Sequence, residues 1–112
     1  MGVWGYKPWE SDLASDWYAD LFQKTKIAKY VRETLNLDVR EHFEEIRAAA
    51  ALLIALGYKY VWPIDDLGGD LRLATLKLEA ILADGCCPLN ESKEIVSLIN
   101  EEIATLKRRL LD

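Results

Sequence analysis

Residues that commonly carry chemistry are scarce in this chain of 112 residues, which has one histidine, two cysteines and one methionine. The histidine, His42, has no cysteine close in sequence, whereas a zinc site normally needs three or four nitrogen, sulfur or oxygen ligands. The cysteines, Cys86 and Cys87, are adjacent and lack the two intervening residues of a thioredoxin-like motif. Phosphate-binding glycine loops and nucleophile elbows are also missing from the sequence. The sequence therefore gives no support for an enzyme, and we expect no cofactor.

Long apolar runs and an excess of basic charge are missing too. The longest apolar run covers residues 48–56, far short of the ~20 residues that span a bilayer. The sequence does not begin with basic residues followed by an apolar run, so we expect no signal peptide. The net charge of −5 disfavours nucleic acid or an anionic membrane as a partner. Adjacent cysteines, which bridge each other only under strain, fit a reducing compartment. We therefore expect a cytoplasmic protein.

Hydrophobic residues in helical spacing are abundant. The composition, 51% hydrophobic and 29% charged, is typical of a globular chain, and the length suits one domain. Apolar residues three and four positions apart predict helices over residues 12–23, 25–35, 39–57 and 67–83 and from residue 90 onward. We expect residues 58–63 to form an extended connector. The sequence thus predicts an all-α fold over residues 1–112: a single compact bundle of about five helices with an aromatic-rich N-terminal segment packed on it.

The predicted helices have definable ends and partners. Short polar side chains that accept from free first-turn amides predict N-caps at Ser11, Asp65 or Asp66, and Asn90. Glycines predict helix ends at residues 57 and 85. We expect helix 39–57 to be central, because residues 48–56 are apolar all round. Helix 67–83 carries two apolar stripes, so we expect it to have two packing partners, of which one could be a second copy of the chain.

Aromatic residues are concentrated near the N-terminus. Trp4, Tyr6 and Trp9 precede the first predicted helix, and Trp17 lies within it. One interpretation is that the rings fold back and plug the bundle, each burying about 150–250 Å². The other is that they remain exposed to receive a ligand or partner, since tryptophan and tyrosine are enriched in interface hot spots.

The same segment resembles a known bacterial family whose members open with M-G-x-W-G and continue with D-x-A-x-D-W. The matching positions are Met1, Gly2, Trp4, Gly5, Trp9, Glu10, Ser11, Asp12, Ala14, Asp16 and Trp17. In these residues the chain is similar to the domain-of-unknown-function family numbered forty-two fifty-nine. Members often carry Gly-Pro-Phe or Gly-x-Phe where this chain has Lys7-Pro8-Trp9. The resemblance implies a bacterial protein with a compact helical domain, and it implies no activity.

Three aspartates, Asp12, Asp16 and Asp20, repeat every four residues and so project from one helix face. Such a row could hold a divalent cation if further oxygen ligands converge on it, for example from residues 65–70. Alternatively, the row is a solvated face, or it pairs with the basic stripe that follows in the next predicted helix. That stripe consists of Lys26, Lys29 and Arg32.

These features favour a non-enzymatic protein-interaction domain of an immunity-type or regulatory kind. The candidate binding residues are Trp4, Tyr6, Trp9 and Trp17. The alternative is a domain that binds a divalent metal or small ligand through Asp12, Asp16 and Asp20. The expected partner is another protein, with a homodimer as a further option.

Overall fold

The computed structural model describes residues 3–84 and 87–112, which contain α-helices, one 3-10 helix and no strand. The helices are α1 (Asp12–Thr25), α2 (Ile27–Leu35), α3 (Val39–Leu56), α4 (Ile64–Ala83), η1 (Pro88–Glu91) and α5 (Lys93–Leu111). The expected all-α fold with five α-helices is confirmed. None of the helices in these ranges combines the length and apolar character needed to cross a membrane.

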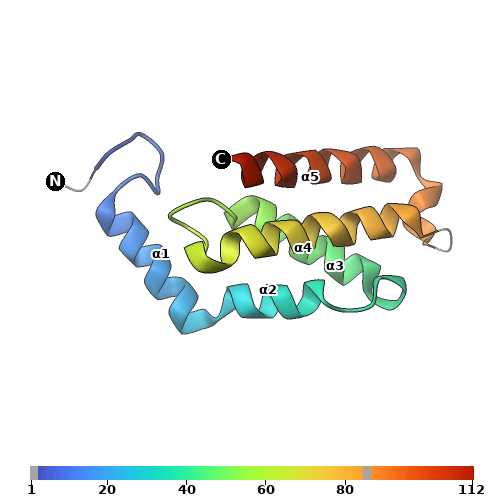
Figure 1. Cartoon of the computed structure of the whole chain (residues 1–112), viewed down its shortest axis with the longest axis horizontal. Helices are drawn as coiled ribbons and strands as arrows, with labels where there is room; N and C mark the ends of the chain where they lie inside the picture. Colours follow the sequence, from blue (N-terminus) through green and yellow to red (C-terminus); the bar gives the residue numbers. More distant parts are fainter. Residues whose placement is uncertain (1–2, 85–86) are drawn as a thin grey trace.

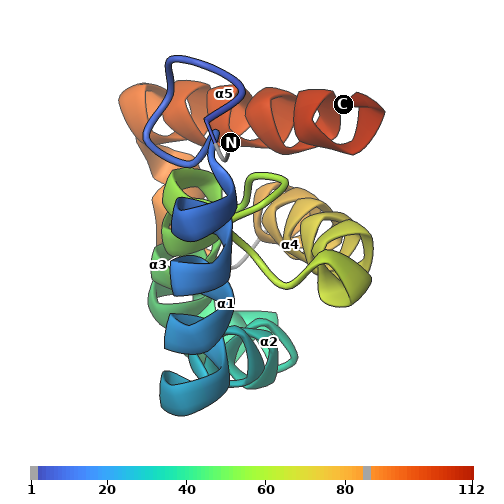
Figure 2. The ribbon, with the colours of Figure 1, turned by 90° about the vertical axis from the view of Figure 1, so that its left-hand side faces the viewer.

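Helices α2 to α5 run alternately in opposite directions along the long axis of the molecule, whereas α1 lies across one end of the bundle (Figure 1). Figure 2 views that end directly and shows α1 crossing in front of the other helices. The molecule is elongated, with extents of 53 × 26 × 18 Å. Because α1 covers an end instead of a side, Phe22 is its one fully buried residue.

Helix α4 occupies the centre of the bundle. It packs against α2, α3 and α5, and it buries seven residues whereas α3 buries four. The first of its two predicted stripes is fully buried: Leu67, Leu71, Ala74, Leu78 and Ile81. The second stripe is not, and Leu76 within it is 62% exposed. Helix α3, which the sequence predicted to be central, also packs against three helices, but it buries fewer residues, so α4 and not α3 is the most buried helix.

The predicted core face of α3 is confirmed, but the expectation that its second half is surrounded was wrong. Ile46, Ala50 and Leu53 are fully buried. On the opposite side Ala48, Ala51, Leu52 and Ala55 are exposed. The physical reason is the position of α1, which packs across the end of the bundle and leaves this side of α3 uncovered (Figure 2).

The first caps follow the sequence prediction. The Ser11 side chain accepts a hydrogen bond from the Ala14 amide at 3.1 Å, and α3 ends at Gly57. At α4 the prediction was wrong, because the helix begins at Ile64 directly after Pro63 and no side chain caps it. Asp65 and Asp66 instead lie in its first turn, where the positive end of the helix dipole stabilises carboxylates.

Asn90 has a different task from the predicted one. The N-cap of α5 is Ser92, which accepts from the Ile95 amide at 3.3 Å. Asn90 lies in η1 and donates from Nδ2 to the carbonyl oxygens of Ile81 (2.9 Å) and Asp84 (2.6 Å), closing the end of α4. Cys87 at this junction is free and buried, as expected of a packing residue. Gly85 and Cys86 lie outside the described residues.

The connector between α3 and α4 turns tightly, so the expected extended form was wrong. The amides of Val61 and Trp62 both donate to the Tyr58 carbonyl, at 3.1 and 3.0 Å. Tyr60 takes a left-handed backbone conformation with φ 70°, which is uncommon for a residue with a side chain. The turn buries Val61 and Trp62 and leaves Tyr58 and Tyr60 facing the N-terminal segment.

Candidate functional site

Two aromatic pairs, one stacked and one edge to face, attach the N-terminal segment to the connector. The rings of Trp9 and Tyr58 are nearly parallel, with centroids 4.6 Å apart and an interplanar angle of 20°. Trp4 meets Tyr60 edge to face at 4.7 Å, and its indole N–H donates to Asp12 at 3.1 Å. Such pairs contribute about 0.5–1.5 kcal/mol beyond the area they bury. For Trp9, which packs against the core, the plug interpretation therefore describes the structure.

Positive charge surrounds these rings. The guanidinium carbon of Arg109, near the end of α5, lies 3.8 Å from the Tyr58 ring centroid. Arg109 Nη1 also donates to the Gly57 carbonyl at 3.2 Å, which fixes the side chain against the end of α3. Lys7 Nζ lies 5.7 Å from the Trp9 ring centroid. Both contacts fall in the range of cation–π attraction.

A cavity of about 380 Å³ opens at this place, between the N-terminal loop, the connector, the start of α4 and the end of α5. We call it the basic aromatic pocket. Its side chains include Trp4, Trp9, Tyr58, Lys59, Arg72 and Arg109. Its volume lies at the small end of the range found for ligand-binding cavities.

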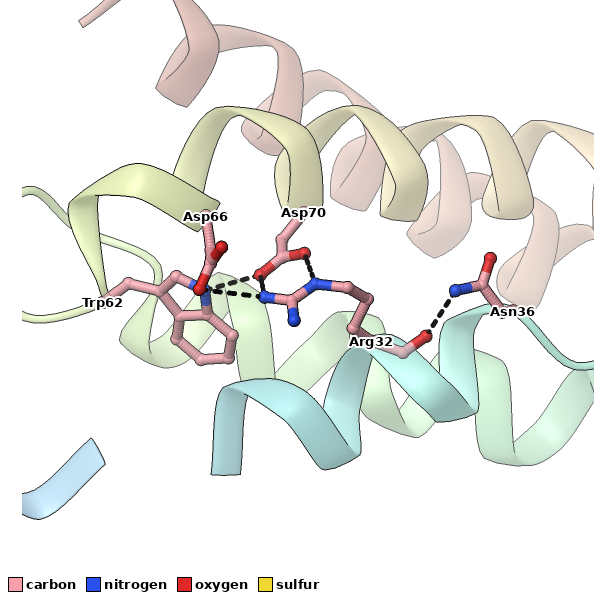
Figure 3. Close-up of polar contacts among 5 residues, drawn as sticks. All are labelled: Arg32, Asn36, Trp62, Asp66 and Asp70. Atoms are coloured by element: carbon pink, nitrogen blue, oxygen red, sulfur yellow. Dashed lines mark hydrogen bonds and ion pairs between the residues drawn. The ribbon is translucent and has the colours of Figure 1, made fainter. Parts of the chain in front are cut away.

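A third aromatic pair leads into a buried ion pair. Phe22 of α1 meets Trp62 of the connector edge to face at 5.1 Å. The Trp62 indole N–H donates to Asp70 Oδ2 at 2.9 Å. Asp70 is 2% exposed and also accepts from Arg32 Nε at 2.7 Å and Nη2 at 2.8 Å. Figure 3 shows this bidentate pair between α2 and α4, with Asp66 completing the group at 3.2 Å from Arg32 Nη2.

This cluster links α2, the connector and α4, and its role is structural. The hydrogen bonds with Asp70, followed by its negative charge, raise the pKa of Arg32, so the arginine is firmly charged. The carbonyl of Arg32 accepts from Asn36 Nδ2 at 3.1 Å (Figure 3). The ion pair between Arg32 and Asp70 was not predicted from the sequence, although the spacing of Asp70 indicates its burial. Asp70 is three residues after Leu67 and four before Ala74, so it stands on the buried stripe of α4.

Three of the four candidate binding residues are exposed, and Trp9 is half-buried; of the three, Trp4 (44% exposed) is partly covered by its contacts with the connector. Tyr6 is fully exposed and Trp17 is 62% exposed, together with Val3 (71%) and Leu13 (81%). Trp17 touches only its neighbour Tyr18 among aromatic rings in the described residues, edge to face at 5.2 Å. We call Val3, Tyr6, Leu13 and Trp17 the N-terminal apolar surface. Trp4 and Trp9 belong instead to the pairs with the connector.

The three aspartates of α1 have separate contacts. Asp12 accepts from the Trp4 indole, and Asp20 forms an exposed ion pair with Lys24 at 3.1 Å. Asp16 is exposed beside them. Across the part of the chain that the structure describes, no three His, Cys, Asp or Glu side chains are grouped so that they could hold a metal ion.

Of the alternatives for the aspartate row, the pairing with the basic stripe of the next helix was wrong, and the row is exposed. Arg32 turns to Asp66 and Asp70 of α4, and within residues 3–84 and 87–112 neither Lys26 nor Lys29 forms an ion pair with α1. The reason is the bend between α1 and α2 at Lys26, which has a left-handed backbone conformation with φ 57°. The bend carries α1 away across the end of the bundle, so the two faces do not oppose each other.

His42 lies near the start of α3, away from the basic aromatic pocket. Its Nδ1 is 2.9 Å from a carboxylate oxygen of Glu45, three residues further along the same helix. The backbone at His42 departs from helical geometry, with φ −129° and ψ 30°. This local pair is partly exposed and has no third group that could make it a metal site among the described residues.

Comparison with known proteins supports the resemblance that the N-terminal segment suggests. The family model Domain of unknown function (DUF4259) matches residues 2–61, which include the N-terminal segment, the first three α-helices and both tyrosines that pair with Trp4 and Trp9. No curated protein and no solved structure matches the chain. Since the match covers more than half of the sequence, the chain belongs to the family Domain of unknown function (DUF4259).

Proposed function

We propose that the chain is a non-enzymatic protein-interaction domain, of an immunity-type or regulatory kind, that binds another protein through the N-terminal apolar surface. The observation that carries the proposal is the exposure of Leu13 (81%) and Trp17 (62%), one turn apart on the same face of α1. Single exposed hydrophobic residues are normal on protein surfaces. Here, however, five exposed large hydrophobic residues lie within residues 3–17, namely Trp4 and the four of the N-terminal apolar surface. An exposed indole is the side chain most enriched in binding hot spots.

The charges beside this surface indicate the chemistry of the partner. Asp12, Asp16 and Asp20 each lie next in sequence or one turn away from Leu13 or Trp17, and all three are exposed. An apolar stripe bordered by carboxylates is complementary to an apolar recess bordered by lysine or arginine. Such border charges mainly raise the association rate and make it depend on salt.

The expected contribution of Trp17 is large. With 62% of its surface exposed, a partner could cover about 150 Å² of the indole. At about 25 cal/mol per Å², that burial corresponds to at most about 4 kcal/mol. After the costs of association, we expect truncation to alanine to lose about 2 kcal/mol, or roughly thirtyfold in the dissociation constant.

Native mass spectrometry of the protein isolated gently with its bound partners tests this proposal. The wild-type chain and the control variant Leu76→Ala should each retain a second polypeptide, whereas Trp17→Ala should lose it. Leu76 is a suitable control because it is also 62% exposed but lies on α4. If the retained mass is that of a second identical chain, the partner is a homodimer copy. Equal retention by Trp17→Ala would refute the proposal.

A further inference from the structure

The charge of the basic aromatic pocket is opposite to that of the rest of the molecule. The whole chain has a net charge of −5. Around the cavity, however, lie four basic residues, Lys7, Lys59, Arg72 and Arg109, against the two acids Glu10 and Asp112. One of these carboxylates is already engaged, since Glu10 accepts from the backbone amide of Lys7 at 3.2 Å. The local field therefore favours an anion.

The cations have donors to spare. Arg72 and Lys59 form no ion pair anywhere in the described ranges. The positions three and four residues from Arg72 on α4 are Gly68, Gly69, Thr75 and Leu76, so its own helix supplies no carboxylate. Arg109 uses one of its five N–H donors on the Gly57 carbonyl, and a guanidinium can present the others to a carboxylate in a fork.

Gly68 shapes the wall of the pocket on the side of α4. It lines the cavity, and the atoms nearest to the position of a Cβ there are the guanidinium nitrogens of Arg72, at 3.6 Å. The Arg72 guanidinium therefore lies directly over Gly68, beside the cavity. A longer residue at position 68 would take up space that the cavity now has.

The remaining surface is aromatic and apolar. Trp4, Trp9, Tyr58 and Tyr60 line the cavity with Leu67, and two of these rings are held by stacking on each other. A simple inorganic anion would pair with the basic side chains but would leave this apolar surface exposed to water. A neutral apolar molecule would leave the unpaired cations unused.

We infer that the basic aromatic pocket binds a small organic anion whose carboxylate is carried on a flat aromatic body. The carboxylate faces Arg72, Arg109 and Lys59, and the ring lies against the indoles of Trp4 and Trp9. This binding site is distinct from the proposed protein-binding surface, because Trp17 does not line the cavity.

An NMR titration of the full chain with 2-naphthoate tests the inference, because each tryptophan indole N–H gives its own signal. The signals of Trp4 and Trp9 should shift saturably, while those of Trp17 and Trp62 should not. The neutral amide of the same acid should bind about tenfold more weakly, since it lacks the charge that the arginines recognise. Failure of Trp4 and Trp9 to respond at millimolar probe, or equal binding of the amide, would overturn the inference.

Variants assign the effect to the pocket. Arg72→Gln and Lys59→Gln should each raise the dissociation constant of 2-naphthoate about fivefold. Arg108→Gln, an exposed arginine of α5 outside the cavity, should change it by less than about twofold. Trp17→Ala should leave it unchanged, so failure here and failure of the proposed protein partner can be told apart. An unchanged constant in both pocket variants would refute the assignment.

Discussion

Replacing Asp70 with asparagine should destabilise the fold by about 3 kcal/mol. The carboxylate is 2% exposed, and it accepts from Arg32 Nε, Arg32 Nη2 and the Trp62 indole at 2.7 to 2.9 Å. Asparagine keeps the shape but removes the charge, and its amide nitrogen cannot accept. Removing one partner of a buried pair costs about 3–5 kcal/mol. We choose the lower end because the Arg32 side chain is 33% exposed and retains Asp66.

Urea unfolding followed by circular dichroism measures this free energy, since a tryptophan signal would be biased by Trp62 in the cluster. A double-mutant cycle with Arg32→Met should give a coupling energy of about 2 kcal/mol between Arg32 and Asp70. Lys107→Met, which breaks the exposed pair with Glu79, is the control and should cost less than about 0.5 kcal/mol. A loss below about 1 kcal/mol for Asp70→Asn, or additive single effects, would refute the reasoning.

The pH dependence of this cluster has a defined sign for its arginine. The pKa of Arg32 is raised, first by hydrogen bonds with Asp70 and then by its charge. A raised pKa means that the stabilisation from the charged arginine is fully present below the ordinary arginine pKa and is lost only as pH rises beyond it. Between neutral pH and about pH 10, titration of Arg32 should therefore leave the free energy of unfolding unchanged.

Two further predictions concern helix ends and interiors. Gly69→Ala should raise the free energy of unfolding by about 1 kcal/mol, because Gly69 is helical and a Cβ there meets no atom within 4 Å. A lower free energy of unfolding in urea would show that the added Cβ does not fit. Ser92→Ala should lower stability by about 1 kcal/mol through loss of the α5 cap, with Ser97→Ala, in the exposed interior of the same helix, as the control. If the two serine variants melt at the same temperature, the cap assignment is wrong.

Helical periodicity predicted the fold class and most of the buried faces. The stripe from Leu67 to Ile81 and the face around Ala50 follow from spacing alone, because burial of one side is what produces such a pattern. The position of α1 did not follow, because it depends on the bend at Lys26, and a left-handed lysine leaves no mark in the sequence. That one bend explains both the exposed side of α3 and the failed pairing of the acidic and basic helices.

The candidate site was only half predictable. The concentration of aromatic residues near the N-terminus was visible in the sequence. Which of these rings pack on the fold was not, because Trp9 and Trp4 pair with Tyr58 and Tyr60, about fifty residues away. The connector was predicted to be extended because its residues are typical of β-strands, whereas it forms a tight turn in which two amides donate to the Tyr58 carbonyl. Long-range contacts of this kind arise from tertiary packing, which overrides local propensity.

The most direct test of this account compares the stability of two tryptophan variants. Trp9 is part of the fold, because it stacks on Tyr58 and packs against the core, whereas Trp17 is exposed. In urea unfolding, Trp9→Ala should lose about 2 kcal/mol, below the value for a fully buried ring, whereas Trp17→Ala should lose less than about 0.5 kcal/mol. Equal losses, or a larger loss for Trp17→Ala, would show that Trp17 is needed for folding and would contradict the account.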